Sequence, residues 1–278
     1  MSSSANPDLT GQVAIVTGSG GGIGRATALA LAAAGAAVAV VDMATHDTAA
    51  AIQAAGGHAL DITLDVTDQG AVESMVHQVE EQFGAVDLLA NAAAIALESM
   101  GSIWEVDPDK WWRGVNVNLR GQFLTMRAVL PGMIRRRKGR IINWGSGSTY
   151  SDQPNLSAYC SSKAAVARLA GCAAEETREY GIAVFSIDPG LVRTPMTEAI
   201  MTTPAGQKWM PGARDGFDSG VDVPPEVCAR LVVQLASGKA DACSGHFIGV
   251  EDDLDELILR ADEITRDELF ALKVHKFK

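Results

Sequence analysis

The sequence predicts a single α/β domain in which helices flank a doubly wound parallel sheet of about seven strands. Two observations support this fold class. Short, continuous apolar segments alternate with longer helical segments along most of the chain, as in parallel strands buried on both faces. The chain has 278 residues, of which 47% are hydrophobic, so it can bury the core of one large domain. We expect a flexible N-terminus over residues 1–8, the domain itself over 9–250, and a C-terminal extension packed on it over 251–278.

The composition excludes several functional classes. A net charge of -11 disfavours a nucleic-acid partner, which needs a basic surface. The four cysteines are widely spaced and the five histidines lack partners at ligand spacing, so no disulfide framework and no metal site are expected. No basic and apolar leader opens the chain, and the apolar stretch at 26–41 is too short to cross a bilayer. We therefore expect a cytoplasmic protein with no membrane partner.

The first predicted strand covers residues 13–17 and runs directly into a glycine turn, GSGGGIG, at 18–24. An alanine- and leucine-rich helix follows over 25–34. A strand, a glycine turn and a helix in this order leave backbone N–H groups free at a helix N-terminus, where they can bind a pyrophosphate. This context favours a dinucleotide site over a simple turn. The residues expected to contact the cofactor here are Gly18, Gly22, Ile23 and Gly24.

The second strand, residues 37–41, ends at Asp42. A carboxylate at this point can accept hydrogen bonds from the adenosine ribose and would repel a 2'-phosphate. Met43 and Ala44 follow, and neither could neutralise such a phosphate. The pattern favours NAD over NADP. The alternative is a solvated residue at the end of a strand.

The alternation of strands and helices continues through the middle of the chain. We expect helices at 46–55 and 68–83 and strands at 58–64 and 85–90. Asn91 follows the fourth strand with three alanines, whose small side chains suit backbone beside a ligand or are loop filler. A long helical stretch over 108–133 follows, most of whose apolar residues are expected in the core or at a subunit interface.

A fifth strand, residues 140–144, places Ser146 at its carboxyl end, the side on which open α/β sheets bind ligands. The next helix, reaching 180, carries Tyr159 and Lys163 four residues apart and therefore on one face. A tyrosine with a pKa near ~10 is a poor base unless a positive charge stabilises its phenolate. Lowering this pKa by about three units needs about 4 kcal/mol, so a second cation besides Lys163 is required. On its own, this pair also fits a chance arrangement in an amphipathic helix.

The last part of the chain completes the predicted sheet. A strand at 182–187 is followed by the turn Asp188-Pro189-Gly190, and a helix at 225–235 precedes a final strand at 245–250. We expect the irregular segment 191–223 between them to form a substrate lid. Its apolar residues are Met196, Met201, Trp209, Met210 and Phe217. Residues 251–278 are charged with spaced apolar positions, which predicts an amphipathic extension.

These ordered motifs resemble the short-chain dehydrogenase/reductase family over about residues 9–250. TGSGGGIG at 17–24 matches its glycine turn, ANAA at 90–93 imperfectly matches its NNAG motif, and Tyr159-x-x-x-Lys163 is its signature. The resemblance implies a Rossmann-type fold and the catalytic residues Asn118, Ser146, Tyr159 and Lys163. It also implies the cofactor-binding residues Gly18, Gly22, Ile23, Gly24, Asp42, Asp65, Val66, Asn91, Tyr159, Lys163, Pro189, Gly190, Val192 and Thr194.

The sequence departs from the family pattern in three places. Ala90 and Ala93 replace an asparagine and a glycine, and Trp144-Gly145 replaces a small apolar residue and a serine. The segment after 249 lacks the short glycine-rich end of many relatives. None of these departures touches the four catalytic positions.

The resemblance implies an NAD-dependent dehydrogenase that interconverts a secondary alcohol and a ketone, here with an apolar or cyclic small-molecule substrate. Tyr159 would be the general base for oxidation or the acid for reduction, assisted by Lys163 and the oxidised nicotinamide. Ser146 would bind the substrate oxygen and Asn118 would anchor a water. The alternatives are an NADPH-preferring carbonyl reductase and a catalytically silent nucleotide-binding protein. Family analogy further implies a homotetramer or a homodimer.

Overall fold

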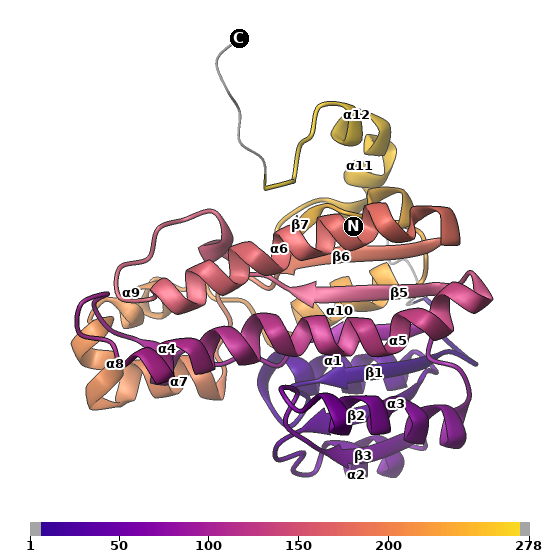
Figure 1. The fold of residues 1–278 in the computed structure, drawn as a ribbon, viewed down its shortest axis with the longest axis horizontal. Coiled ribbons are helices and arrows are strands. Elements are labelled where there is room, and N and C mark those ends of the chain that lie inside the picture. Colours follow the sequence, from indigo (N-terminus) through magenta and orange to yellow (C-terminus); the bar gives the residue numbers. More distant parts are fainter. Residues whose placement is uncertain (1–6, 273–278) are drawn as a thin grey trace.

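The computed structural model describes residues 7–272, which form one seven-stranded parallel sheet in the order β3-β2-β1-β4-β5-β6-β7 (Figure 1). The strand order therefore reverses at the β1/β4 boundary, as in a Rossmann-type sheet. The predicted fold class is confirmed. The strands are β1 (Val13–Thr17), β2 (Ala37–Asp42), β3 (Ala59–Thr63), β4 (Leu88–Asn91), β5 (Gly139–Trp144), β6 (Ile182–Asp188) and β7 (Phe247–Gly249).

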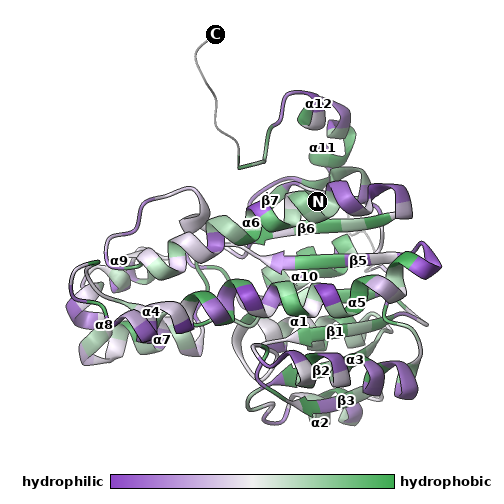
Figure 2. Cartoon of the chain, viewed as in Figure 1, coloured by the Kyte–Doolittle hydropathy of each residue, from purple (hydrophilic) through white to green (hydrophobic). Residues whose placement is uncertain are grey.

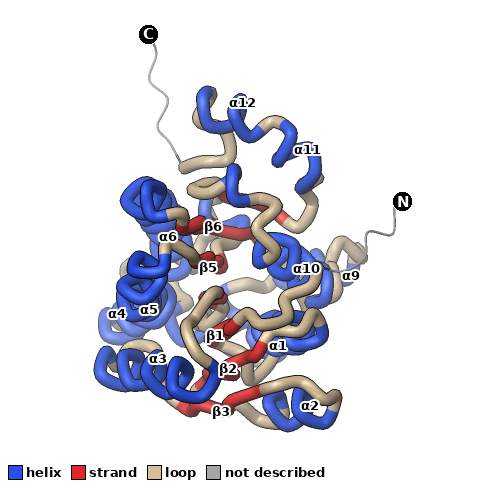
Figure 3. The backbone as a smooth tube through the Cα atoms, turned by 90° about the vertical axis from the view of Figure 1, so that its right-hand side faces the viewer, coloured by secondary structure: helices blue, strands red, loops and turns tan. Residues whose placement is uncertain are grey.

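Helices cover both faces of the sheet, as the view along its edge shows (Figure 3). One face carries α1 (Gly22–Ala33), α2 (Thr48–Ala54) and α10 (Pro225–Ala236). The other carries α3 (Gln69–Phe83), α5 (Gln122–Arg136) and α6 (Ser157–Thr177). The expected helix over 108–133 is divided into α4 (Pro108–Val115), a π-helical turn (Asn116–Gly121) and α5.

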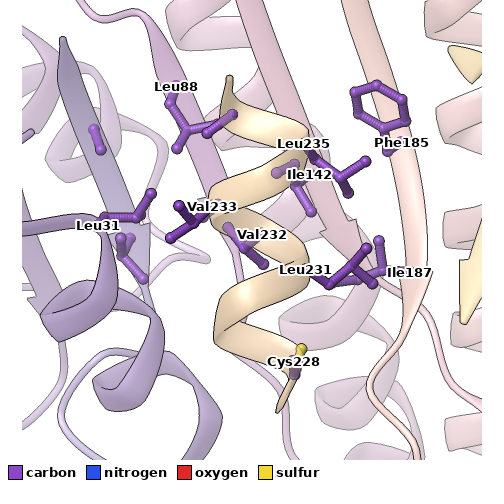
Figure 4. Packing of buried hydrophobic residues seen from close by; sticks show 14 of the residues in the cluster. Leu31, Leu88, Ile142, Phe185, Ile187, Cys228, Leu231, Val232, Val233 and Leu235 are labelled. Atoms are coloured by element: carbon purple, nitrogen blue, oxygen red, sulfur yellow. The ribbon is translucent and has the colours of Figure 1, made fainter. Parts of the chain in front are cut away.

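The alternation of side chains along the strands divides the core between the two faces. In β1, Ala14 and Val16 pack with α1 and α10, whereas Val13 and Ile15 pack with α3, α5 and α6. Both sets are buried, which explains why the strands read as continuous apolar runs and appear green in Figure 2. Figure 4 shows the first of these layers, where Leu231 and Leu235 of α10 face the sheet.

The segment 191–223 is more regular than predicted. It forms three short helices, α7 (Pro195–Thr202), α8 (Pro204–Trp209) and α9 (Ala213–Asp218). Pro195 and Pro204 stand at the first helical position of α7 and α8, where a missing N–H costs nothing. Thr194 and Thr203 cap these two helices through their side chains. The expectation of an irregular segment was therefore wrong, because two of its prolines begin helices.

The described part of the extension, 251–272, contains α11 (Leu254–Leu259) and α12 (Ala261–Arg266). Leu257 and Ile264 are buried in the same core layer as α10. Phe247 of the edge strand β7 donates its N–H to the Phe270 carbonyl at 2.7 Å. Residues 273–278, and most of the N-terminus predicted to be flexible (1–8), lie outside the described residues. No helix within 7–272 combines the length and apolar character needed to cross a membrane.

Candidate active site

A cavity of about 530 Å³ lies at the carboxyl ends of the central strands, between the glycine turn and α7. Figure 1 shows α7, α8 and α9 grouped beyond these strand ends. The cavity brings together most of the residues singled out in the sequence, although they come from segments up to about 180 positions apart. The predicted residues that line it are Gly18, Gly22, Ile23, Gly24, Ser146, Tyr159, Lys163, Pro189, Gly190, Val192 and Thr194.

The glycine turn forms one end of the cavity. Gly18 has φ 70, and a Cβ there would lie 2.6 Å from the backbone nitrogen of Ala93, so only glycine fits. No side chain caps the N-terminus of α1, and Gly22 and Ile23 of its first turn line the cavity. This uncapped helix start fits the pyrophosphate of a dinucleotide. Thr194 lies opposite, because a Cβ on Gly22 would meet its Cγ2 at 3.2 Å.

Asp42 lies beside the same turn at the end of β2. Its Oδ2 accepts a hydrogen bond from the Gly20 N–H at 2.9 Å, and its Oδ1 accepts one from the Met43 N–H at 2.7 Å. The carboxylate is thus held next to the glycines, although it does not line the main cavity. His46, to which we assigned no role, does line it and adopts φ 51.

Tyr159, Lys163 and Ser146 line the same cavity. The first turns of α6 supply Tyr159 and Lys163, and the loop after β5 supplies Ser146, whose hydroxyl is hydrogen-bonded to the tyrosine. Lys163 is almost fully buried, and its Nζ donates to the Trp144 carbonyl at 2.7 Å. The same Nζ lies 5.5 Å from the centre of the Tyr159 ring.

The charges of this pair are set by burial. Burial raises the pKa of Tyr159 to about 12, although the hydrogen bond with Ser146 acts in the opposite direction. Burial also lowers the pKa of Lys163 to about 8, although the charge of Asp188 opposes that change. We expected Lys163 to help lower the tyrosine pKa, but the protein groups together raise it. The protein groups around Tyr159 therefore keep its phenol protonated at neutral pH.

Asn118 lies behind the cavity rather than on its wall. Its Oδ1 accepts from the Ile95 N–H at 2.8 Å, and its Nδ2 donates to the Ile95 carbonyl at 2.9 Å and to the Ser162 hydroxyl at 3.2 Å. The side chain therefore joins the π-helical turn to the loop after β4 and to α6. Such turns occur often at functional sites. Asn116, at the start of the same turn, is exposed.

The family model for short chain dehydrogenases matches residues 12–205, well over half of the chain. The chain belongs to the short-chain dehydrogenase/reductase family. A member from Armillaria gallica is 37% identical over 87% of this chain and 95% of its own length. The 3-oxoacyl-acyl-carrier-protein reductase of Thermotoga maritima is 30% identical over 69% of this chain and 75% of its own length. The crystal structure of a Mycobacterium marinum short-chain dehydrogenase/reductase aligns with a TM-score of 0.79 and 32% identity, covering 87% and 94% of the two chains.

Three further residues predicted for the cofactor in this dehydrogenase/reductase do not line the cavity. Asp65 accepts hydrogen bonds from the backbone and hydroxyl of Thr67, both at 2.8 Å. Val66 is buried and packs against Gly121, since a Cβ added to Gly121 would lie 2.7 Å from the Cγ2 of Val66. Asn91 donates to the Asn143 side chain at 3.0 Å and accepts from the Thr125 hydroxyl at 2.8 Å. The Asp65 side chain thus stabilises the turn before α3, and the Asn91 side chain joins β4 to β5 and α5.

Another part of the cavity wall in this dehydrogenase/reductase is apolar. Met196 and Met210 line it, whereas Met201 and Phe217 are buried in packing and Trp209 is packed in the same apolar cluster. Three apolar residues of this wall were not predicted from the sequence, namely Ala96, Leu156 and Ile200. Each is a single apolar residue in a loop or a short helix, and periodicity cannot distinguish such a residue from ordinary packing.

Proposed function

We propose that this protein is an NAD(H)-dependent oxidoreductase that interconverts a secondary alcohol and a ketone on an apolar or cyclic small molecule. One observation carries the proposal. Ser146, Tyr159 and Lys163 open into the same cavity as the glycine turn of the dinucleotide fold and an apolar wall. Nucleotide, proton-transfer groups and an organic substrate can therefore meet in one cavity.

In the proposed mechanism the nicotinamide, when bound, supplies hydride transfer and, in its oxidised form, a positive charge. Ser146 binds the substrate oxygen and fixes the distance between the reacting carbon and the cofactor. Tyr159 gives a proton to that oxygen during reduction and removes it during oxidation. Lys163 holds a positive charge close to the phenol, since its Nζ lies 5.5 Å from the ring. Its pKa of about 8 leaves it mostly protonated at neutral pH.

The hydrogen bonds of Asp42 support NAD as the cofactor. The Gly20 and Met43 N–H groups keep this carboxylate at the end of β2, next to the first glycines. A carboxylate there can pair with ribose hydroxyls, whereas a 2'-phosphate would bring a second negative charge beside it. Neither Met43 nor Ala44 offers a compensating cation.

The apolar wall supports the substrate class. Leu156, Ile200 and Met196 belong to a small apolar cluster that also packs against Tyr159. A substrate carbon skeleton bound there would gain stabilisation in proportion to its buried apolar area, about 25 cal/mol per Å². A charged substrate would lose hydration without an opposite charge on this wall.

The first prediction concerns cofactor choice, measured as kcat/KM for NAD and for NADP with a panel of cyclic and aryl secondary alcohols. We expect NAD to be preferred by about 100-fold or more, because excluding a phosphate next to a fixed carboxylate is worth at least ~2.7 kcal/mol. Asp42→Ala should reduce this preference by at least about tenfold. Asp61→Ala, an exposed carboxylate on β3, is the matched control and should leave it unchanged.

Two results would contradict the proposal in different ways. A wild-type preference for NADP would favour the carbonyl reductase alternative. Cofactor binding without turnover on any alcohol or ketone of the panel would favour the silent nucleotide-binding protein.

A further inference from the structure

Asp188 is a buried carboxylate at the end of β6 that the proposed mechanism does not use. Asp188 is 7% exposed. Its Oδ1 accepts a hydrogen bond from the Gly190 N–H at 3.1 Å, and its Oδ2 accepts one from the Tyr150 hydroxyl at 3.4 Å. The backbone N–H of Gly147 donates a further hydrogen bond to the same carboxylate. Burying a carboxylate is costly, and these donors offset part of that cost.

The donors come from two different loops. Gly147 directly follows Ser146 in the loop after β5, and Gly190 lies in the loop after β6 that lines the cavity. The carboxylate therefore joins the loop that carries the hydroxyl for the substrate oxygen to the loop expected beside the nicotinamide. Tyr150 belongs to the first loop, and its ring packs edge-on against Phe247 of β7, with ring centres 5.9 Å apart.

The charge of Asp188 also reaches the catalytic pair. It raises the pKa of Lys163, against the effect of burial, and it raises the pKa of Tyr159. Asp252 and the Tyr150 hydroxyl are the ionisable groups that act on Asp188 itself, whose own pKa is raised mainly by burial. Cys228 of α10 is a further group within its field.

We propose that Asp188 is a positioning residue that fixes the Ser146 loop to the Gly190 loop and whose negative charge acts on the buried Lys163 ammonium. The expected effect on kcat rests on the proposed function, whereas the expected effect on the titration of Lys163 does not. It does not require Asp188 to touch the substrate.

An amide is a poor replacement for this carboxylate. Both oxygens of Asp188 accept hydrogen bonds, whereas asparagine has a single acceptor oxygen, and its NH₂ group would face a donor. Asp188→Asn thus keeps the shape of the side chain, removes its charge and leaves one loop without its acceptor. Tyr150→Phe is milder, because both backbone N–H groups keep their acceptor. Asp61→Asn on β3 is the matched control for the chemical change.

The experiment combines kinetics with ¹³C NMR of lysine-labelled protein, using Lys163→Met to assign the Lys163 signal. For Asp188→Asn we expect kcat with NAD to fall at least about tenfold while KM changes less than about threefold. The titration midpoint of Lys163 should fall, since the neighbouring negative charge is gone. Tyr150→Phe should lower kcat by about two- to fivefold, and Asp61→Asn should change neither quantity.

Unchanged kcat in both Asp188→Asn and Tyr150→Phe would overturn the proposal. A loss of kcat with an unmoved Lys163 midpoint would also overturn it, because a merely structural role gives that result. If the wild type turns over no substrate, the proposed function fails, and the Lys163 midpoint alone decides the role of Asp188. If Asp188→Asn does not fold, Tyr150→Phe decides, and full activity of that variant counts against the proposal.

Discussion

Tyr159 and Lys163 lie in an environment that disfavours charge on either side chain. The pKa of the phenol is raised to about 12 and the pKa of the amine is lowered to about 8, both mainly through burial. The residue pair alone therefore suits proton donation to a ketone. In our account, removal of a proton from an alcohol needs the positive charge of the oxidised nicotinamide as well.

The shifted pKa of Lys163 predicts a change of stability with pH. Its pKa is about 8 in the folded protein against an ordinary value of 10.5, so between these values the unfolded chain binds more protons. Stability should then rise with pH across this window, by about 2 kcal/mol between pH 8 and pH 10. Tyr159 acts in the opposite direction only above pH 10, because its pKa is raised from 10.0.

Urea unfolding at several pH values between 7 and 10 measures this effect. Lys163→Met, which cannot titrate, is the control, and its stability should lack the rise attributed to Lys163. Parallel curves for the two proteins would contradict the assigned environment of the amine.

At the residue level, the sequence located the side chains of the cavity better than those behind it. Ser146, Tyr159 and Lys163 line the cavity as expected, because ordered motifs and the strand-end rule place them there. The Asn118 and Asn91 side chains are instead used in hydrogen bonds to Ile95, Asn143 and Thr125. Such pairings depend on the three-dimensional contact of distant segments, which a single sequence does not reveal.

Among the secondary-structure elements, the glycine turn and the start of α7 enclose the cofactor end of the cavity from two sides. Gly22 has φ 53, and its missing side chain leaves room next to Thr194 and Pro195. Thr194 itself is fixed, because it caps α7 in a reciprocal pair with Thr197. The width of this end is therefore determined by a helix cap and a glycine.

Gly22→Ala should weaken NAD binding by about tenfold or more and destabilise the fold by about 1 kcal/mol. The added methyl group would lie 3.2 Å from the Cγ2 of Thr194. The alanine would also have to adopt the left-handed backbone conformation of Gly22, which is unfavourable for a residue with a side chain. Isothermal titration calorimetry and urea unfolding measure the two effects. Gly70→Ala in α3, where the nearest atom is 3.6 Å away, should leave NAD affinity unchanged and stability equal or up to about 1 kcal/mol higher. Equal NAD affinity of wild type and Gly22→Ala would contradict this geometry.

The helix α11 offers a matched test of how the extension contributes to stability. Leu257 is 7% exposed and packs in the core layer of α10, whereas Leu259 is 85% exposed. Leu257→Ala should reduce the free energy of unfolding by about 2–4 kcal/mol, because it leaves a cavity. Leu259→Ala should change it by less than about 0.5 kcal/mol. Similar urea midpoints for the two variants would show that the extension is not part of the cooperative unit.

At the scale of the whole molecule, the order of the strands creates the site. The carboxyl ends of β1, β4, β5 and β6 lie side by side, so the glycine turn, Ser146 and Gly190 reach one cavity. The sequence predicted this topology because each strand is a short apolar run and each connection contains a helix. It did not predict the three short helices α7, α8 and α9, since proline occurs both in loops and at helix starts, and the substrate itself is not encoded in any motif.

We propose that Tyr159 transfers the proton while NAD accepts or gives the hydride. The most direct measurement is the turnover of wild type and Tyr159→Phe, followed by NADH absorbance with the best alcohol of the panel, together with their NAD affinities. Tyr180→Phe is the control for the chemical change. We expect Tyr159→Phe to lose about 10²- to 10⁴-fold in kcat while binding NAD as tightly as wild type. Retention of NAD-dependent turnover within a few-fold of wild type would contradict the account.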